Sequence, residues 1–197
     1  TGVSYSIATV VEALARAPKA TAALVSIFCS AHDPENEGDR ATAMKNAAVG
    51  FDEALKAVKA IDDDRILRLL RAVIDATLRT NAFAPQAAEA LAFKIESRKV
   101  PTLPAPIPYR EIWVYSPRVE GIHLRGGPVA RGGLRWSDRR DDFRTEILGL
   151  MKAQLVKNAV IVPTGAKGGF YPKQLPSPAI DRDAWFEEGK ESYRIFI

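Results

Sequence analysis

The chain has 197 residues, 47% of them hydrophobic, enough to form the core of one large domain or two small ones. It contains neither an apolar run of about 18 residues, as a membrane-spanning helix requires, nor a signal-peptide pattern. Cys29 is the only cysteine, which excludes an intrachain disulfide and a cysteine zinc site and fits a reducing compartment. We therefore expect a soluble, cytoplasmic protein with no membrane partner and no bound metal.

Charge is distributed unevenly along the chain, whose formal net charge is +4 at pH 7. The segment 125–173 contains ten Lys and Arg against four Asp and Glu, a balance of +6, so the remainder is slightly acidic at −2. Such a basic segment attracts anions, either phosphates or carboxylates.

The first part of the chain has the periodicity of helices. The alanine-rich stretch 7–31 is broken by Pro18 and predicts two short helices or one kinked helix. Apolar residues spaced by three and four predict a helix within 40–60 and another within 62–78. Aspartates at the start of the latter suit a cap and the positive end of the helix dipole. We expect residues 1–85 to form a helical region without a catalytic constellation.

Strand signals begin after residue 85. Alternating side chains predict a strand within 91–97, and four prolines then predict an extended linker over 100–108. The stretches 111–116 and 121–125 are rich in strand-forming residues and predict a hairpin. His123 lies in its second strand without a neighbouring histidine or cysteine, which favours a structural role over catalysis.

A helix, an apolar run and a glycine-rich stretch follow in succession. Residues 141–157 have helical spacing, Asn158 is a plausible C-terminal cap, and 159–162 predict a strand buried on both faces. Gly165–Gly169 would then form a turn at the carboxyl end of that strand, where α/β sheets commonly bind ligands. A last helix should begin at Asp181 or Asp183.

Two glycine-dense stretches carry a long cation each: Arg131-Gly132-Gly133, and Gly165–Gly169 with Lys167 at its centre. Glycines let other atoms approach the backbone closely, so both suggest loops shaped around a ligand, although ordinary turns are the simpler reading. In a buried turn, desolvation lowers the pKa of a lysine amine and lets it accept a proton.

Known phosphate and nucleic-acid motifs fit this segment poorly. A Walker loop has Ser or Thr after its lysine, whereas Lys167 is followed by Gly168. The Gly-x-Gly-x-x-Gly spacing of a dinucleotide site does not occur, and no nucleic-acid reading module is recognisable.

An ordered set of motifs resembles the large bacterial NAD-specific glutamate dehydrogenases. The runs are VEGIHLRGG at 119–127, ARGGLRWSDRR at 130–140, VKNAVIVP at 156–163 and GAKGG at 165–169. The resemblance implies an α/β fold in which a helical region precedes, over 86–197, the first part of a Rossmann-like substrate domain with a mixed sheet. It also implies oxidative deamination of L-glutamate to 2-oxoglutarate and ammonia, with NAD as the hydride acceptor.

The same resemblance implies roles for individual residues. Lys167 matches the catalytic lysine that promotes attack of water on the imino intermediate, a role that requires a depressed pKa. Lys157 matches the lysine that holds the α-carboxylate, with Gln154 one turn earlier as a second contact. Arg131, followed by Gly132 and Gly133, stands where the wider family often has a lysine that contacts the side-chain carboxylate. This exchange keeps the charge but presents a planar fork.

Other parts of the enzyme are expected outside this chain. The resemblance places a catalytic aspartate and the main NAD-binding domain beyond Ile197, so we do not expect the fragment to be active alone. It implies a homo-oligomer in the full-length protein and no nucleic-acid partner. Two alternatives stay open from the residues: a non-catalytic basic module that binds anions or regulates, and a structural domain whose glycines only serve turns.

Overall fold

The computed structural model describes residues 5–157 and 162–197. The chain forms two compact units: the first runs to Thr77 and includes Lys99–Pro104, and the second comprises Leu78–Arg98 and Ala105–Ile197. The division into functional domains at residue 85 stays a prediction. No helix among the described residues has the length and apolar character to cross a bilayer.

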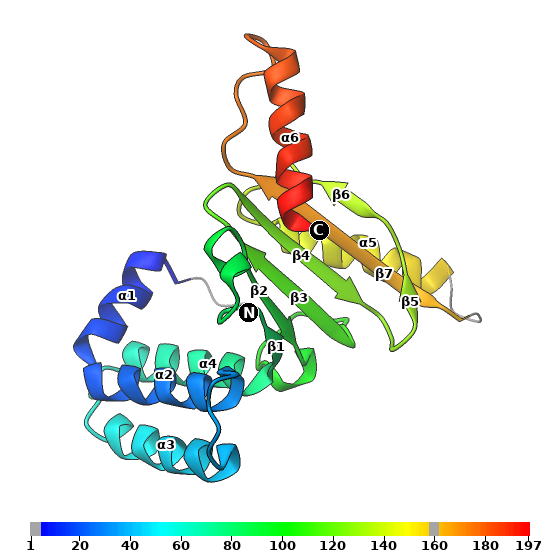
Figure 1. The fold of residues 1–197 in the computed structure, drawn as a ribbon. Helices are drawn as coiled ribbons and strands as arrows, with labels where there is room; N and C mark the ends of the chain where they lie inside the picture. Colours follow the sequence, from blue (N-terminus) through cyan, green and yellow to red (C-terminus); the bar gives the residue numbers. More distant parts are fainter. Residues whose placement is uncertain (1–4, 158–161) are drawn as a thin grey trace. The chain divides into compact units, whose positions relative to one another are not determined.

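The first unit is built from four helices (Figure 1). They are α1 (Ile7–Arg16), α2 (Pro18–His32), α3 (Arg40–Leu55) and α4 (Ile61–Ala76). Pro18 occupies the first turn of α2, where its missing N–H costs nothing. Of the two predicted arrangements, the structure has two helices separated at this proline and not one kinked helix. The core of this unit contains Leu24, Ile27, Phe51, Leu55 and Leu67.

Helix α4 begins differently from the sequence prediction. Its N-cap is Ala60, which makes no side-chain cap hydrogen bond, whereas Asp62, Asp63 and Asp64 lie inside the first turn. The prediction that these aspartates cap the helix was therefore wrong, but their charges still lie at the positive end of the helix dipole.

The second unit contains a mixed seven-stranded sheet with the order β1-β2-β3-β4-β7-β5, and β6 also pairs with β7. The strands are β1 (Thr77–Thr80), β2 (Leu91–Ile95), β3 (Arg110–Tyr115), β4 (Val119–Arg125), β5 (Ala130–Arg131), β6 (Leu134–Trp136) and β7 (Thr164–Pro172). Short 3₁₀ helices span Pro85–Ala88 and Ser97–Lys99. The pairs β2–β3, β3–β4 and β4–β7 are antiparallel, while β5 and β6 run parallel to β7. Helices first and a mixed sheet afterwards confirm the expected α/β class.

The predicted hairpin is present, with β3 and β4 in antiparallel register from Arg110↔Arg125 to Tyr115↔Glu120. Residues 100–108 belong to no helix or strand, as their prolines predict.

The prediction of a glycine-rich turn was wrong, because Gly165–Gly169 lie inside β7. This strand pairs with β4 over seven register positions, from Val119↔Pro172 to Arg125↔Ala166. Of the predicted strand 159–162, only Val162 is described, and it lies in an exposed bend; Asn158 and residues 159–161 lie outside the described residues. Glycine usually indicates a turn, but here it lets neighbouring elements approach a strand closely.

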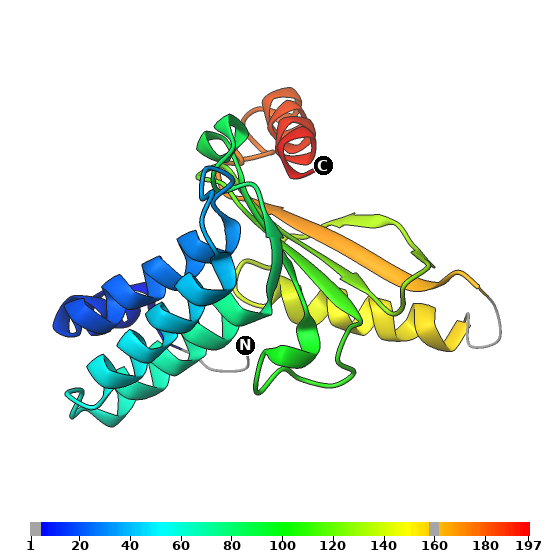
Figure 2. The same ribbon diagram turned by 60° about the horizontal axis from the view of Figure 1, so that its bottom comes forward.

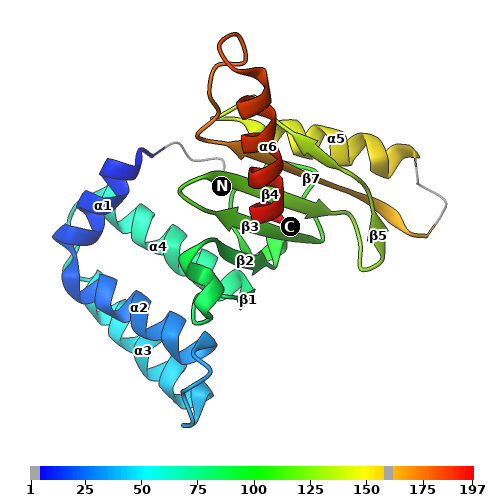
Figure 3. The same ribbon diagram turned by 45° about the horizontal axis from the view of Figure 1, so that its top comes forward.

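Two helices lie on opposite faces of this sheet (Figure 2). Helix α5 (Phe143–Lys157) packs Ile147, Leu148 and Met151 against Ile122 and Leu124 of β4. Helix α6 (Arg182–Phe196) lies over β4 and β7 (Figure 3).

Aromatic contacts hold α6, since Phe196 stacks on Phe170 at 5.7 Å and Trp185 on Trp136 at 4.5 Å between ring centroids. Asp181 caps α6 by accepting a hydrogen bond from the Ala184 N–H, as expected.

A buried carboxylate joins the sheet to α5. Glu111 of β3 is fully buried and accepts hydrogen bonds from Arg144 Nη2 at 2.7 Å and Trp113 Nε1 at 2.9 Å. A buried carboxylate is tolerated only when its charge is paired and its oxygens are hydrogen-bonded. This network therefore fixes the position of α5 on β3.

We predict that Glu111→Ala lowers the free energy of unfolding by about 3–5 kcal/mol, because it leaves the Arg144 charge and the Trp113 N–H without their buried partner. Urea denaturation measures the change. Glu187→Ala is the control: it removes an exposed carboxylate from a surface pair with Lys190, and it should leave the midpoint nearly unchanged. Equal effects of the two substitutions would contradict the assigned role of Glu111.

Candidate active site

The α5-covered face of β7 carries Gly165, Lys167 and Gly169. A β-carbon at Gly165 would lie 2.6 Å from Gln154 Cβ, and one at Gly169 would overlap Ile147, so both glycines lie directly beneath α5. Because side chains alternate along a strand, Lys167 points to the same face as the two glycines. Its register partner Leu124 belongs to the core under α5, which supports this orientation.

The amine of Lys167 reaches the other glycine motif. A β-carbon at Gly133 would lie 3.7 Å from Lys167 Nζ, which is ordinary contact distance. The lysine is half-buried, and no carboxylate among the described residues pairs with its amine. Arg135 and Arg144 of the same basic segment, in contrast, each form an ion pair. Lys167 therefore offers a positive charge that is not neutralised within the part of the chain that the structure describes.

Close backbone packing holds the Arg131–Gly133 stretch against β7. Arg131 is the parallel register partner of Gly165, and a β-carbon at Gly132 would overlap the carbonyl oxygen of Ala166. Only glycine permits this approach at position 132. The Arg131 side chain is exposed and, as a register partner of Gly165, points to the face on which Gln154 lies.

Lys157 is the last residue of α5 and lies one turn after Gln154. Its side chain is exposed, and it makes no hydrogen bond or ion pair with the described residues. Residues 158–161, which follow it, lie outside the described residues. The structure thus brings Arg131, Gly132, Gly133, Gln154 and Lys167 into one neighbourhood, while the role of Lys157 in holding the α-carboxylate stays a prediction.

Glu146 supports this neighbourhood, and the sequence analysis missed it. Its carboxylate accepts a hydrogen bond from Ser137 Oγ at 2.6 Å and another from Arg135 Nε. Burial acts to raise the pKa of Glu146, but the hydrogen bonds from Ser137 and Arg135 hold that pKa below its usual value. The pair connects β6 to α5 and fixes the chain just after Gly133. The sequence signal for this contact was an arginine and a serine shortly before a helix with a glutamate in its first turn.

His123 lies on the opposite face of the sheet, as the register partner of Gly168. Burial, and then the nearby charge of Arg125, lower its pKa, so the neutral imidazole is favoured. No cluster of three or more His, Cys, Asp and Glu side chains suited to a metal occurs among the described residues. The assignment of a structural role to His123 stays a prediction.

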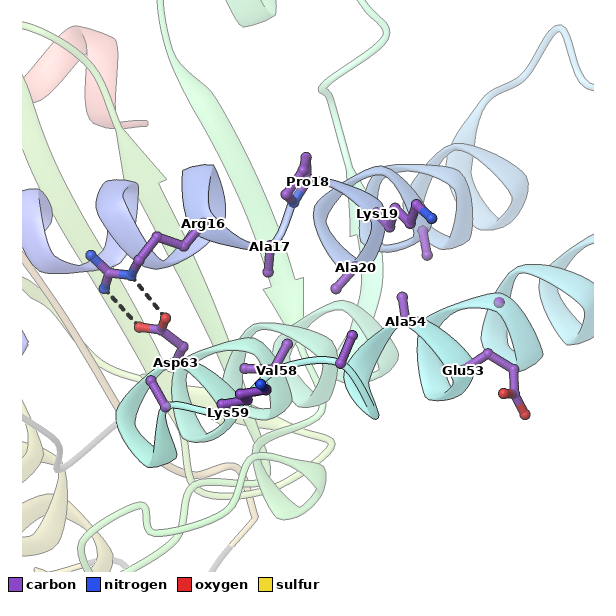
Figure 4. Close-up of a pocket in the computed structure, with 14 residues that line it drawn as sticks. Arg16, Ala17, Pro18, Lys19, Ala20, Glu53, Ala54, Val58, Lys59 and Asp63 are labelled. Carbon is purple, nitrogen blue, oxygen red and sulfur yellow. Dashed lines mark hydrogen bonds and ion pairs between the residues drawn. The ribbon is translucent and has the colours of Figure 1, made fainter.

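The first unit contains a separate groove of about 930 Å³, shown in Figure 4. Six alanines of α2, α3 and the residues that flank these helices are among its lining residues. The pair Arg16–Asp63 lies at one end, with 2.7 Å between Nη2 and Oδ1. The hydrogen bond from Arg16 holds the pKa of Asp63 below its usual value. The carboxylate is thus an ion-pair partner and not a proton donor near neutral pH.

We predict that Gly132→Ala destabilises the second unit by about 1–3 kcal/mol, because the added methyl group forces β5 and its following loop away from β7. Thermal or urea unfolding measures this. Gly149→Ala is the matched control, since nothing lies within 4 Å of a β-carbon there and the position is helical. It should stabilise by up to about 1 kcal/mol. A neutral Gly132→Ala would show that the close approach is not required.

Comparison with known proteins gives consistent matches. A family model described as bacterial NAD-glutamate dehydrogenase, catalytic domain, matches residues 50–197. A protein of Mycobacterium tuberculosis named NAD-specific glutamate dehydrogenase is 50% identical over 206 residues, covering 100% of this chain and 13% of the relative. Proteins of the same name from Pseudomonas aeruginosa and Halomonas elongata are 54% and 51% identical, over 83% and 91% of the chain. The chain spans only 10–13% of the length of these relatives.

Proposed function

The chain belongs to the family of bacterial NAD-glutamate dehydrogenases, and from this premise we propose that it supplies part of an active site for glutamate oxidation. The resemblance read from the sequence motifs is confirmed by these matches. In the proposed reaction, L-glutamate, water and NAD⁺ give 2-oxoglutarate, ammonium, NADH and a proton. Hydride passes from Cα of glutamate to NAD⁺, which leaves an imine. Water then replaces the nitrogen at the same carbon.

The observation that carries the proposal is the position of the Lys167 amine beside Gly133, without a carboxylate partner among the described residues. A cation in this position attracts an anionic substrate, and after loss of a proton the amine can accept one from water. We assign Lys167 to the attack of water on the imino carbon. The two hydrogens of Gly133 leave room for substrate next to the amine, where a side chain would crowd it.

The proposed substrate is a dicarboxylate, and two further cations are available to bind its two carboxylate groups. Arg131 extends to the α5 face of the sheet and would bind the side-chain carboxylate through its planar fork. Lys157 and Gln154, one turn apart on α5, would hold the α-carboxylate. Arg131 and Lys157 are exposed and without ion-pair partners in the described part of the chain, which leaves their charges available.

The sequence of the chain contains no recognisable NAD-binding turn. Members of the family are named for NAD, yet the chain lacks the Gly-x-Gly-x-x-Gly spacing that brings a backbone close to the pyrophosphate. We propose that a domain beyond Ile197 holds the cofactor and that an aspartate there completes the proton transfer. We further propose a cytoplasmic homo-oligomer that acts in amino-acid catabolism, as the resemblance implies.

We predict that Lys167→Ala in the full-length enzyme lowers kcat for glutamate oxidation by roughly 10²–10⁴-fold, the usual contribution of a general acid–base group. Steady-state kinetics with glutamate and NAD measure the effect. Lys152→Ala, which removes an exposed cation from the outer side of α5, is the control and should keep wild-type turnover. Unfolding midpoints show whether Lys167→Ala is folded, and unchanged turnover in the folded variant would exclude the assigned role.

We predict that Arg131→Ala raises KM for glutamate about 10–100-fold, since a hydrogen bond to a charged group contributes about 1.5–3 kcal/mol. Arg131→Lys should restore much of the affinity because it keeps the charge. L-Norvaline, which lacks the side-chain carboxylate, separates specific from general effects: its KM should change little in Arg131→Ala. If both substrates lose affinity equally, Arg131 does not contact the side-chain carboxylate.

A further inference from the structure

The sheet of the second unit also borders a cavity of about 350 Å³ that none of the roles above uses. Four cations line it, together with the ring of Tyr109: Arg79 of β1, Lys94 of β2, Arg110 of β3 and Arg125 of β4. None of its described lining residues is a carboxylate. Four strands therefore each present one positive charge to the same small space.

The strand registers place Lys94, Arg110 and Arg125 on the face opposite α5. Glu111 pairs with Arg144 of α5, so the neighbouring Arg110 points the other way. Leu124 belongs to the core under α5, so Arg125 also points away from it. Lys167, the register partner of Leu124, lies on the α5 face. The cavity is consequently separate from the proposed glutamate site.

Within the chain, the charges of the cavity are poorly compensated. Arg110 and Arg125 are direct register partners across β3 and β4, an arrangement in which like charges repel. Glu96 pairs with Arg110 at 2.8 Å, but no ion-pair partner of Arg79, Lys94 or Arg125 occurs among the described residues. Three positive charges therefore face the cavity without a counter-charge in the part of the chain that the structure describes.

Local contacts hold the two arginines of the cavity in place. Arg110 stacks on Tyr109, with 4.2 Å between the guanidinium carbon and the ring centroid, and Arg110 Nη1 donates to the Tyr109 carbonyl. Arg125 Nη2 donates to the Pro128 carbonyl at 3.1 Å, whereas its Nε is buried without a hydrogen-bond partner. Buried donors normally have an acceptor, so this Nε is a donor that a bound anion could satisfy.

We propose that this cavity binds a small phosphate-bearing anion. Guanidinium forks match the geometry of phosphate oxygens, and a phosphate group carries close to two negative charges near neutral pH. A single carboxylate would neutralise only one of the three uncompensated cations. The volume lies near the lower end of the range of small-molecule sites, which suits a compact ligand.

Isothermal titration of the full-length enzyme with inorganic pyrophosphate at fixed ionic strength tests the proposal. The wild-type protein should bind saturably, and Lys94→Gln and Arg79→Gln should each weaken the affinity about tenfold or more. Lys152→Gln is the matched control, because it removes the same charge from an exposed position on α5 and should leave the affinity unchanged. Excess L-glutamate should not displace pyrophosphate, since the two sites lie on opposite faces.

Four results would overturn the proposal. No binding to the wild-type enzyme would mean that the cavity is closed, for example by an acidic segment of the longer protein. Equal weakening by Lys152→Gln would show diffuse attraction to surface charge, and competition by glutamate would place the anion in the substrate site. Unchanged affinity in both Arg79→Gln and Lys94→Gln would remove the cavity from the binding. Arg79 is exposed, so its substitution keeps the test valid if Lys94→Gln does not fold.

Discussion

The close packing of α5 on β7 is the constraint on which the second unit depends. Gly165 and Gly169 let the helix approach the strand so nearly that any side chain at either position would collide with Gln154 or Ile147. Lys167, between them, is the one residue of this stretch with a long side chain on the helix-covered face. The same packing that builds the core therefore leaves a half-buried amine at its margin, beside Gly133.

One buried carboxylate and one half-buried carboxylate keep this arrangement fixed. Glu111 joins β3 to α5 through Arg144, and Glu146 joins α5 to β6 through Arg135 and Ser137. Each neutralises a cation of the basic segment that would otherwise compete for an anionic substrate. Arg131 and Lys167, which have proposed roles in substrate binding and catalysis, form no ion pair within the described structure. The two ion pairs thus support the fold, and the charges of Arg131 and Lys167 stay available for the proposed substrate.

Membership of the glutamate dehydrogenase family gives these local features a chemical meaning. The chain spans a small part of the length of its relatives. It contains Lys167, Arg131 and the paired glycines beside them, but no Gly-x-Gly-x-x-Gly turn for a dinucleotide. This composition suits the proposed role in binding the substrate. The two proposed anion sites lie on opposite faces of one sheet, because alternating side chains of the same strands point in opposite directions.

The sequence by itself determined the elements with local signals. Helical spacing located α1 to α5, Pro18 separated the first two helices, strand-forming residues located the hairpin, and Asp181 was identified as a possible cap. The ordered motifs also identified the family. Tertiary structure alone decided that Gly165–Gly169 form a central strand, because glycine carries no alternation of apolar and polar side chains and its local preference is for turns. It alone also brought Arg79, Lys94, Arg110 and Arg125 to one cavity, since strand pairing joins residues far apart in the chain and leaves no periodic trace between them.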